Sequence, residues 1–212
     1  MRRKKILVFS GDVESKNIGD MAITYNVIRK VRQRWSDAEI VFLSRENVIE
    51  DYDVRTEPGA APYLLRPTPR YLRLIGDLRA RKISLATRYV AVAVAAKARK
   101  AGLAVPTRFD PARLADMVRG ADLLVIAGGG YMNHLFPLLL LEASALSMIA
   151  DRFDVPTMVT GQGVGPFTRD WQKRMIRSIF ERATVAYTRD APSRDLLINL
   201  GINEGKAINL GD

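Results

Sequence analysis

Short apolar runs recur along this sequence, and most of them are followed at once by glycine or by a charged residue. Such runs are typical of strands that are buried on both faces. Segments with helical spacing lie between them. This alternation predicts an α/β fold, a parallel sheet with helices on both faces. The strands are expected near residues 4–10, 39–44, 122–127, 156–160 and 184–188.

The regular pattern fails between residues 45 and 69, where prolines and a glycine indicate an extended loop or an insertion. The basic segment after it favours a helix, although residues 89–95 alternate and would also suit a strand. We therefore expect one domain over residues 1–212, with a basic, partly helical insertion at about 45–108.

Composition excludes several classes of protein. The chain has 212 residues, of which 48% are hydrophobic and 26% charged, and this is typical of a globular domain. It has no cysteine and one histidine, which excludes disulfides, thiolate chemistry and a multi-histidine metal site. Neither the short apolar run after the basic N-terminus nor residues 135–150 suit a signal peptide or a membrane span. We expect a cytoplasmic protein without a metal.

The net charge of +10 indicates that the chain could bind anionic partners. Much of the excess lies between Arg66 and Arg108, where Asp77 is the only acid. Nucleic acid, an anionic membrane and phosphorylated substrates all suit such a segment, and so does a plain solvated helix. No zinc pattern or nucleic-acid-binding aromatic cluster is present, which argues against nucleic acid. We expect this segment to meet anionic lipid or a lipid-linked diphosphate at the inner face of the plasma membrane.

The polar and glycine-rich loops gather at one edge of the predicted sheet. Asp12, Gly128–Gly130, Gly161–Gly165 and Arg189 each follow a predicted strand directly. In open parallel sheets, ligands bind beyond the carboxyl ends of the strands. Glycine lets the backbone approach a ligand, and a helix start presents free N–H groups to anions. The first loop, which ends in a helix with Asp20 in its first turn, is thus predicted to bind a ligand.

These loops do not match a nucleotide-binding fingerprint. The dinucleotide pattern G-x-G-x-x-G does not follow the first strand, and no phosphate-binding G-x-x-x-x-G-K-[ST] occurs. Any one glycine-rich loop, taken alone, could be a tight turn between a strand and a helix.

Taken together, four motifs are more specific. "GDVESKNIGDMAI", "VIAGGGYM", "GQGVGPF" and "YTRDAPSRDLLINLGI" occur in this order. In order and spacing they resemble the polysaccharide pyruvyl transferase family. The resemblance covers nearly the whole chain and is weakest between about residues 45 and 108.

The resemblance implies a Rossmann-like sheet similar to one half of a glycosyltransferase B-type fold. It implies transfer of the pyruvyl group of phosphoenolpyruvate, without a cofactor, onto two hydroxyls of one sugar. The acceptor would belong to a cell-surface polysaccharide or its lipid-diphosphate-linked precursor. Two-domain members are longer, so we expect this chain to be an N-terminal half that is inactive alone; a homo-oligomer also fits.

Candidate site residues follow from the motifs. Asp12 and Asp20 could position acceptor hydroxyls, although Asp20 could merely favour a helix N-terminus. His134 could be a general acid, a phosphate ligand or a plain surface histidine. Arg189 is the expected anion ligand, and Asp190 the cap of the next helix. Gln162, between glycines, is expected to contact a ligand. The other predicted substrate-binding residues are Gly11, Asn17, Gly19, Gly129, Gly130 and Gly163.

Two other functions stay open at this point. A nucleotide-sugar glycosyltransferase half would share the fold. A non-catalytic binding domain in envelope assembly would share the surface but not the reaction. Preference for a nucleotide-sugar over phosphoenolpyruvate would favour the first of these.

Overall fold

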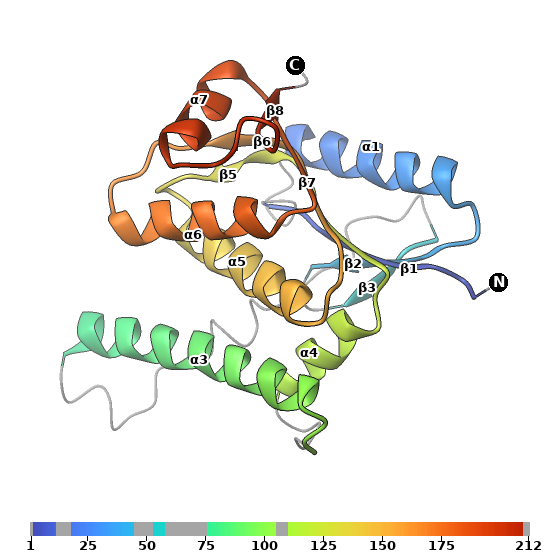
Figure 1. Ribbon diagram of the computed structural model, residues 1–212, viewed down its shortest axis with the longest axis horizontal. Coiled ribbons are helices and arrows are strands. Elements are labelled where there is room, and N and C mark those ends of the chain that lie inside the picture. The colour runs from blue at the N-terminus through green and yellow to red at the C-terminus, as the bar shows by residue number, and fades with distance from the viewer. Residues whose placement is uncertain (1, 12–17, 45–52, 58–75, 105–109, 210–212) are drawn as a thin grey trace.

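The computed structural model describes residues 2–11, 18–44, 53–57, 76–104 and 110–209. They form one open eight-stranded parallel sheet in the order β3-β2-β1-β4-β6-β7-β8, with β5 paired to β6 outside this path (Figure 1). The strands are β1 Lys5–Phe9, β2 Glu39–Leu43, β3 Arg55–Glu57, β4 Leu123–Ile126, β5 Gly129–Met132, β6 Thr157–Val164, β7 Val185–Thr188 and β8 Ile208–Asn209. The described helices are α1 Ile18–Arg34, α3 Asp77–Lys100, α4 Asp110–Arg119, α5 Pro137–Arg152, α6 Asp170–Arg182 and α7 Ala191–Asn199.

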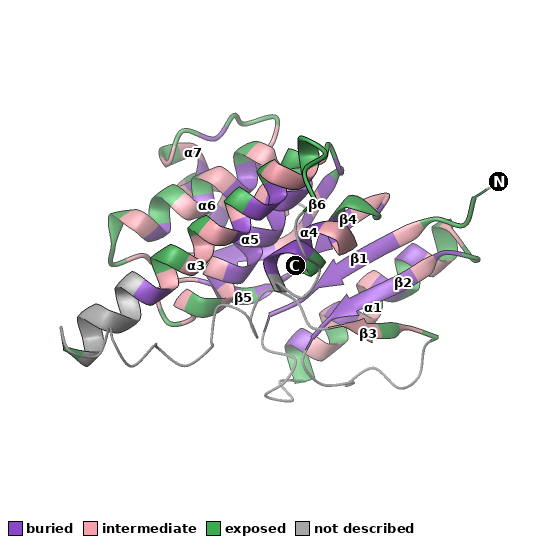
Figure 2. Ribbon diagram, turned by 90° about the horizontal axis from the view of Figure 1, so that it is seen from below, coloured by how far each residue is buried: buried purple, intermediate pink, exposed green. Residues whose placement is uncertain are grey.

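The five strands predicted from apolar runs are all present and all parallel. β1 lies between β2 and β4, with Leu7 opposite both Val41 and Leu124. Figure 2 shows β1 and β2 as mostly buried. Because successive side chains of a strand point to opposite faces of the sheet, a strand that is apolar throughout needs other elements to cover both faces. The predicted α/β class, a Rossmann-like sheet with helices on both faces, is confirmed.

The two faces are covered unequally. Leu7 and Phe9 point to a large core shared with α3, α4, α5, α6 and α7. Ile6 and Val8 point to a smaller core, in which α1 supplies Ile28 and Val31. Figure 1 shows α1 on one side of the sheet and α4, α5 and α6 on the other.

Beside α1, the sheet is left partly open. A largely apolar groove of about 460 Å³ runs between α1 and strands β4, β6 and β7. We call it the α1 groove. Its lining residues are Asn26, Val27, Lys30, Val31, Trp35, Leu123, Val125, Met158, Thr160, Gly161 and Tyr187.

Residues 89–95, whose sequence suited either a helix or a strand, are helical and belong to α3. In a strand, Val90, Val92 and Val94 would share one face, because side chains alternate with a period of two. In a helix, residues two apart lie about 200° apart around the axis. Val92 is fully buried whereas Val90 and Val94 are exposed, as helical geometry requires. α3 packs outside α4 and α5, and Arg99 and Lys100 pair with Asp116 and Asp154 at 2.8 Å each.

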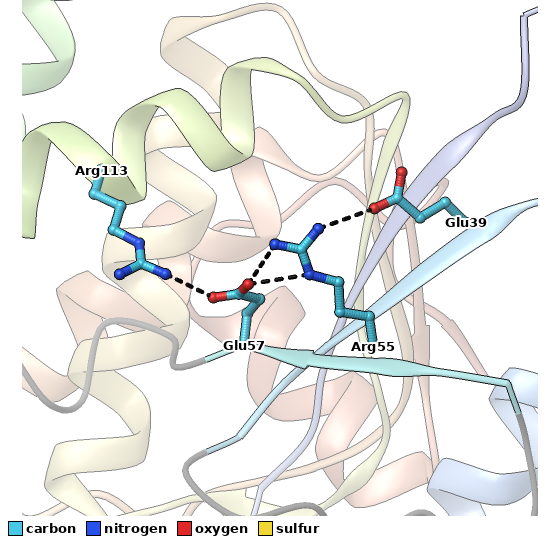
Figure 3. Close-up of polar contacts among 4 residues, drawn as sticks. All are labelled: Glu39, Arg55, Glu57 and Arg113. Atoms are coloured by element: carbon cyan, nitrogen blue, oxygen red, sulfur yellow. Dashed lines mark hydrogen bonds and ion pairs between the residues drawn. The ribbon is translucent and has the colours of Figure 1, made fainter. Parts of the chain in front are cut away.

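β3 lies in the stretch where the sequence predicted only a loop or an insertion. It pairs with β2 at the edge of the sheet and carries charged side chains, so no apolar run marked it. Glu57 accepts hydrogen bonds from Arg55 Nε and from Arg113 Nη2 of α4, both at 3.0 Å (Figure 3). Arg55 also lies 3.7 Å from Glu39 of β2. The hydrogen bond from Arg55 lowers the pKa of Glu57. Charged side chains on an edge strand such as β3 discourage it from pairing with a strand of another molecule.

Two predicted loops are partly strand. β5 includes Gly129 and Gly130, and β6 continues through Gln162 and Gly163 to Val164. The prediction of a loop from Gly161 to Gly165 is therefore wrong for its first four residues. Gly161 has a φ of 52°, and the pairing of β6 with β7 shifts register between Val159 and Gln162. Glycine thus marks an irregularity within a strand rather than its end.

Candidate functional site

A cavity of about 300 Å³ lies at the carboxyl edge of the sheet. It is formed by the first turns of α1, by β5 and the residues after it, and by the residue that follows β7. Its lining residues are Gly19, Asp20, Ile23, Gly130, Tyr131, Phe136 and Arg189. The glycine-rich segments thus meet at one edge, as the sequence predicted.

Arg189 supplies the cation of this cavity. Its backbone N–H donates to the Gln162 carbonyl at 3.0 Å, which fixes the end of β7 against β6. Its guanidinium lies over Gly163, where a Cβ would come within 3.0 Å of Nη2. Its Nε donates to Asp190 Oδ2 at 3.3 Å. Glycine at position 163 therefore makes room for a guanidinium that is still about half exposed, and such a group can bind an anion bidentately.

Asp190 is the N-cap of α7, as predicted. Its Oδ1 accepts a hydrogen bond from the Ser193 amide at 2.8 Å. Hydrogen bonds from Ser193 lower the pKa of Asp190, and the neighbouring Arg189 lowers it further. A carboxylate that is kept ionised in this way also orients the Arg189 side chain.

Asp20 supplies the carboxylate of the cavity. It lies in the first turn of α1, as predicted, and is buried. A Cβ at Gly129 would come within 2.9 Å of Asp20 Oδ1, and the φ of Gly129 is 153°. The first turn of a helix is a favourable place for a carboxylate because of the helix dipole. The two roles expected for Asp20, at a helix N-terminus and in a ligand site, are therefore compatible.

Tyr131 forms the floor of the cavity and was not among the residues predicted from the sequence. Its ring fills the space beside Gly11, where a Cβ would lie 2.0 Å from Cδ1, and it packs edge-to-face on Phe9. Its hydroxyl donates to the Ala127 carbonyl at 2.8 Å. Burial raises its pKa far above the ordinary value, so the phenol is neutral. The only signal in the sequence was its position directly after three glycines.

Gln162 lies beneath this floor rather than at the surface of the cavity. Its side chain is fully buried, and its Nε2 donates to the Ala127 carbonyl and to the Tyr131 hydroxyl. This corrects the expectation of a direct ligand contact. β6 extends through position 162, so the side chain points to the buried Tyr131. Among the described residues, Gln162 Oε1 has no hydrogen-bond partner.

His134 does not line the cavity. It is half-buried and lies before α5, which begins at Pro137 rather than at His134. Both its backbone N–H and its Nδ1 lie 3.1 Å from the Pro166 carbonyl oxygen. Its role as a general acid or phosphate ligand therefore stays a prediction.

The remaining predicted residues fall into three groups. Gly19 and Gly130 line the cavity. Gly11, Gly129 and Gly163 leave room for side chains that do. Asp12 and Asn17 lie outside the described residues.

A family model described as polysaccharide pyruvyl transferase matches residues 17–212. The chain belongs to the polysaccharide pyruvyl transferase family. A search of curated proteins found no match. The matched range includes every described residue that lines the cavity, from Gly19 to Arg189. In this pyruvyl transferase family member, the motifs that first indicated the family thus come together around one site.

The family implies a transferase, and the cavity offers this pyruvyl transferase family member three kinds of contact. The Arg189 guanidinium and the N-terminus of α1 favour anions. The Asp20 carboxylate can accept hydrogen bonds from hydroxyls. Over the described ranges, no group of histidine, aspartate and glutamate side chains could hold a metal ion.

Proposed function

We propose that this chain takes part in ketal pyruvyl transfer from phosphoenolpyruvate to a sugar of a cell-surface polysaccharide or of its lipid-linked precursor. One observation supports this above all others. A guanidinium, that of Arg189, and a carboxylate, that of Asp20, line the same cavity of about 300 Å³. The reaction needs both, because its donor is an anion and its acceptor a pair of hydroxyls.

The donor carries a carboxylate and a phosphate. Arg189 can hold either group with two parallel hydrogen bonds, which fixes its orientation as well as its position. Gly19 lies in the first turn of α1 on the cavity wall, where helix N-termini attract anions. The donor would therefore lie between α1 and the residue that follows β7.

The acceptor would lie toward Asp20. The methylene carbon of the donor takes up a proton, and the oxygen of the first hydroxyl bonds to the adjacent carbon and gives up its own proton. The oxygen of the second hydroxyl then bonds to the same carbon while the C–O bond to phosphate breaks and phosphate leaves. A base accepts the proton of this second hydroxyl. Asp20 is the candidate base, because a carboxylate within hydrogen-bond reach of a hydroxyl can accept its proton. The proton donor to the methylene carbon is not assigned; His134 is a candidate by sequence only.

Titration calorimetry with phosphoenolpyruvate tests the donor site. We expect weak binding to the unmodified chain and a loss of about tenfold or more in Arg189→Gln, since a charged hydrogen bond contributes about 1.5–3 kcal/mol. Arg174→Gln removes an exposed arginine of α6 and should leave binding unchanged. Equal binding by Arg189→Gln and the unmodified chain would refute the assignment. Preference for a nucleotide-sugar would instead favour a glycosyltransferase site.

A further inference from the structure

The outward face of α3 carries apolar side chains in solvent. Val90 and Val94 are 57% and 59% exposed, and Leu103, just beyond the helix, is 61% exposed. Ala86 is also exposed and lies one turn before Val90, on the same face. We call Ala86, Val90, Val94 and Lys97 the α3 face.

The α3 face is basic as well as apolar. Lys97 is exposed three residues after Val94, so the two side chains are neighbours on the helix surface. No aspartate or glutamate occurs from residue 84 to residue 104. Arg99 points the other way and pairs with Asp116 of α4. The helix has a buried side that anchors it to α4 and α5, and an exposed side that combines valines with a lysine.

The place of α3 in the fold leaves this side accessible. Figure 1 shows α3 as an outer layer, separated from the sheet by α5. Figure 2 shows the same helix at the outside of the molecule, with exposed and half-buried residues along it. α3 does not line the cavity. None of the described helices is long and apolar enough to cross a membrane.

We propose that the α3 face lies in the plane of an anionic lipid surface. The valine side chains would enter the headgroup boundary while the lysine contacts acidic headgroups, which is how amphipathic basic helices bind bilayers. A second copy of the chain suits the α3 face less well, because it would bring like charges together without an acid to neutralise them. This inference does not depend on the proposed acceptor or donor.

Vesicle co-sedimentation of the 212-residue chain tests the proposal. Vesicles of phosphatidylcholine alone are compared with vesicles that also contain phosphatidylglycerol. We expect the bound fraction to rise with anionic lipid and to fall as salt is added. Lys97→Glu and Val94→Asp should each weaken binding by about fivefold or more. Circular dichroism checks that both variants fold.

Arg174→Glu is the matched control for Lys97→Glu, because it makes the same change of charge on an exposed position of α6. It should bind vesicles nearly as well as the unmodified chain. Equal binding to neutral and anionic vesicles would overturn the proposal, and so would equal weakening by Arg174→Glu and Lys97→Glu. Light scattering that shows a dimer, dissociated by Val94→Asp, would assign the α3 face to a second copy instead.

Discussion

At the scale of single residues, the site depends on one close contact. Tyr131 occupies the space beside Gly11 and packs on Phe9. Its hydroxyl joins Ala127 of the loop after β4 to Gln162 of β6. The floor of the cavity is thus held by an aromatic ring that fits only because position 11 has no side chain.

We predict that Gly11→Ala destabilises the protein by about 1–3 kcal/mol, because the new methyl group would overlap the Tyr131 ring and force it to move. Urea unfolding followed by circular dichroism measures this. Gly130→Ala is the control, since a Cβ there meets nothing within 4 Å. Equal stability of the two variants would show that the ring moves aside at no cost.

At the scale of elements, α7 is the clearest case of a helix fixed by its first residues. Asp190 caps it, and Arg189 directly before the cap lines the cavity. The same short turn therefore ends β7, starts α7 and presents the cation.

We predict that Asp190→Ala lowers the free energy of unfolding by about 1 kcal/mol at neutral pH, through loss of the cap. The pKa of Asp190 is lower in the folded protein than its ordinary value of 3.8. The carboxylate therefore stabilises the fold above that pH, and the stabilisation is lost as the pH falls through the lowered pKa. The difference between unmodified chain and variant should shrink in acid. Unfolding at several pH values measures it.

Asp195→Ala is the matched control in the same helix, because Asp195 is largely exposed and its one ion pair with a described residue is with Arg194, at 3.4 Å. It should change stability by less than about 0.5 kcal/mol. A pH-independent loss in Asp190→Ala would contradict the assignment of the cap as a carboxylate interaction.

The elements also show what the sequence could and could not predict. Continuous apolar runs fixed the five central strands, because only strands buried on both faces need them. The charged edge strand β3 has no such run and was missed. Arg189 was placed correctly because it directly follows a strand end, and Asp20 because the sequence indicated the start of the helix after the first loop. Gln162 was not, because the sequence does not show that β6 continues past Gly161. Tyr131 was missed, because nothing in the sequence except its place after three glycines set it apart.

At the scale of the whole molecule, the described part of the site is open and carries few charges. Among the described residues that line the cavity, Arg189 is the one cationic side chain. The proposed donor carries both a carboxylate and a phosphate, which normally require several donors at once.

We predict that the 212-residue chain alone binds phosphoenolpyruvate weakly and releases no measurable phosphate with an acceptor sugar. A ketal-forming site must hold the donor and two hydroxyls in reactive geometry together, and the described lining of the cavity provides one cation for this, that of Arg189. A phosphate-release assay measures it. Robust turnover by a monomer would contradict the prediction. Activity that appears only at high protein concentration would indicate two copies sharing one site.

The α1 groove has a practical consequence for these measurements. Dyes that fluoresce in apolar surroundings bind exposed apolar grooves on native proteins, and the α1 groove offers Trp35, Met158 and Tyr187 to such a dye. A dye-reported melting curve of this chain would then start from a bright native baseline and understate the change on unfolding. Backbone dichroism is free of that background, so it is the suitable signal for ranking the variants.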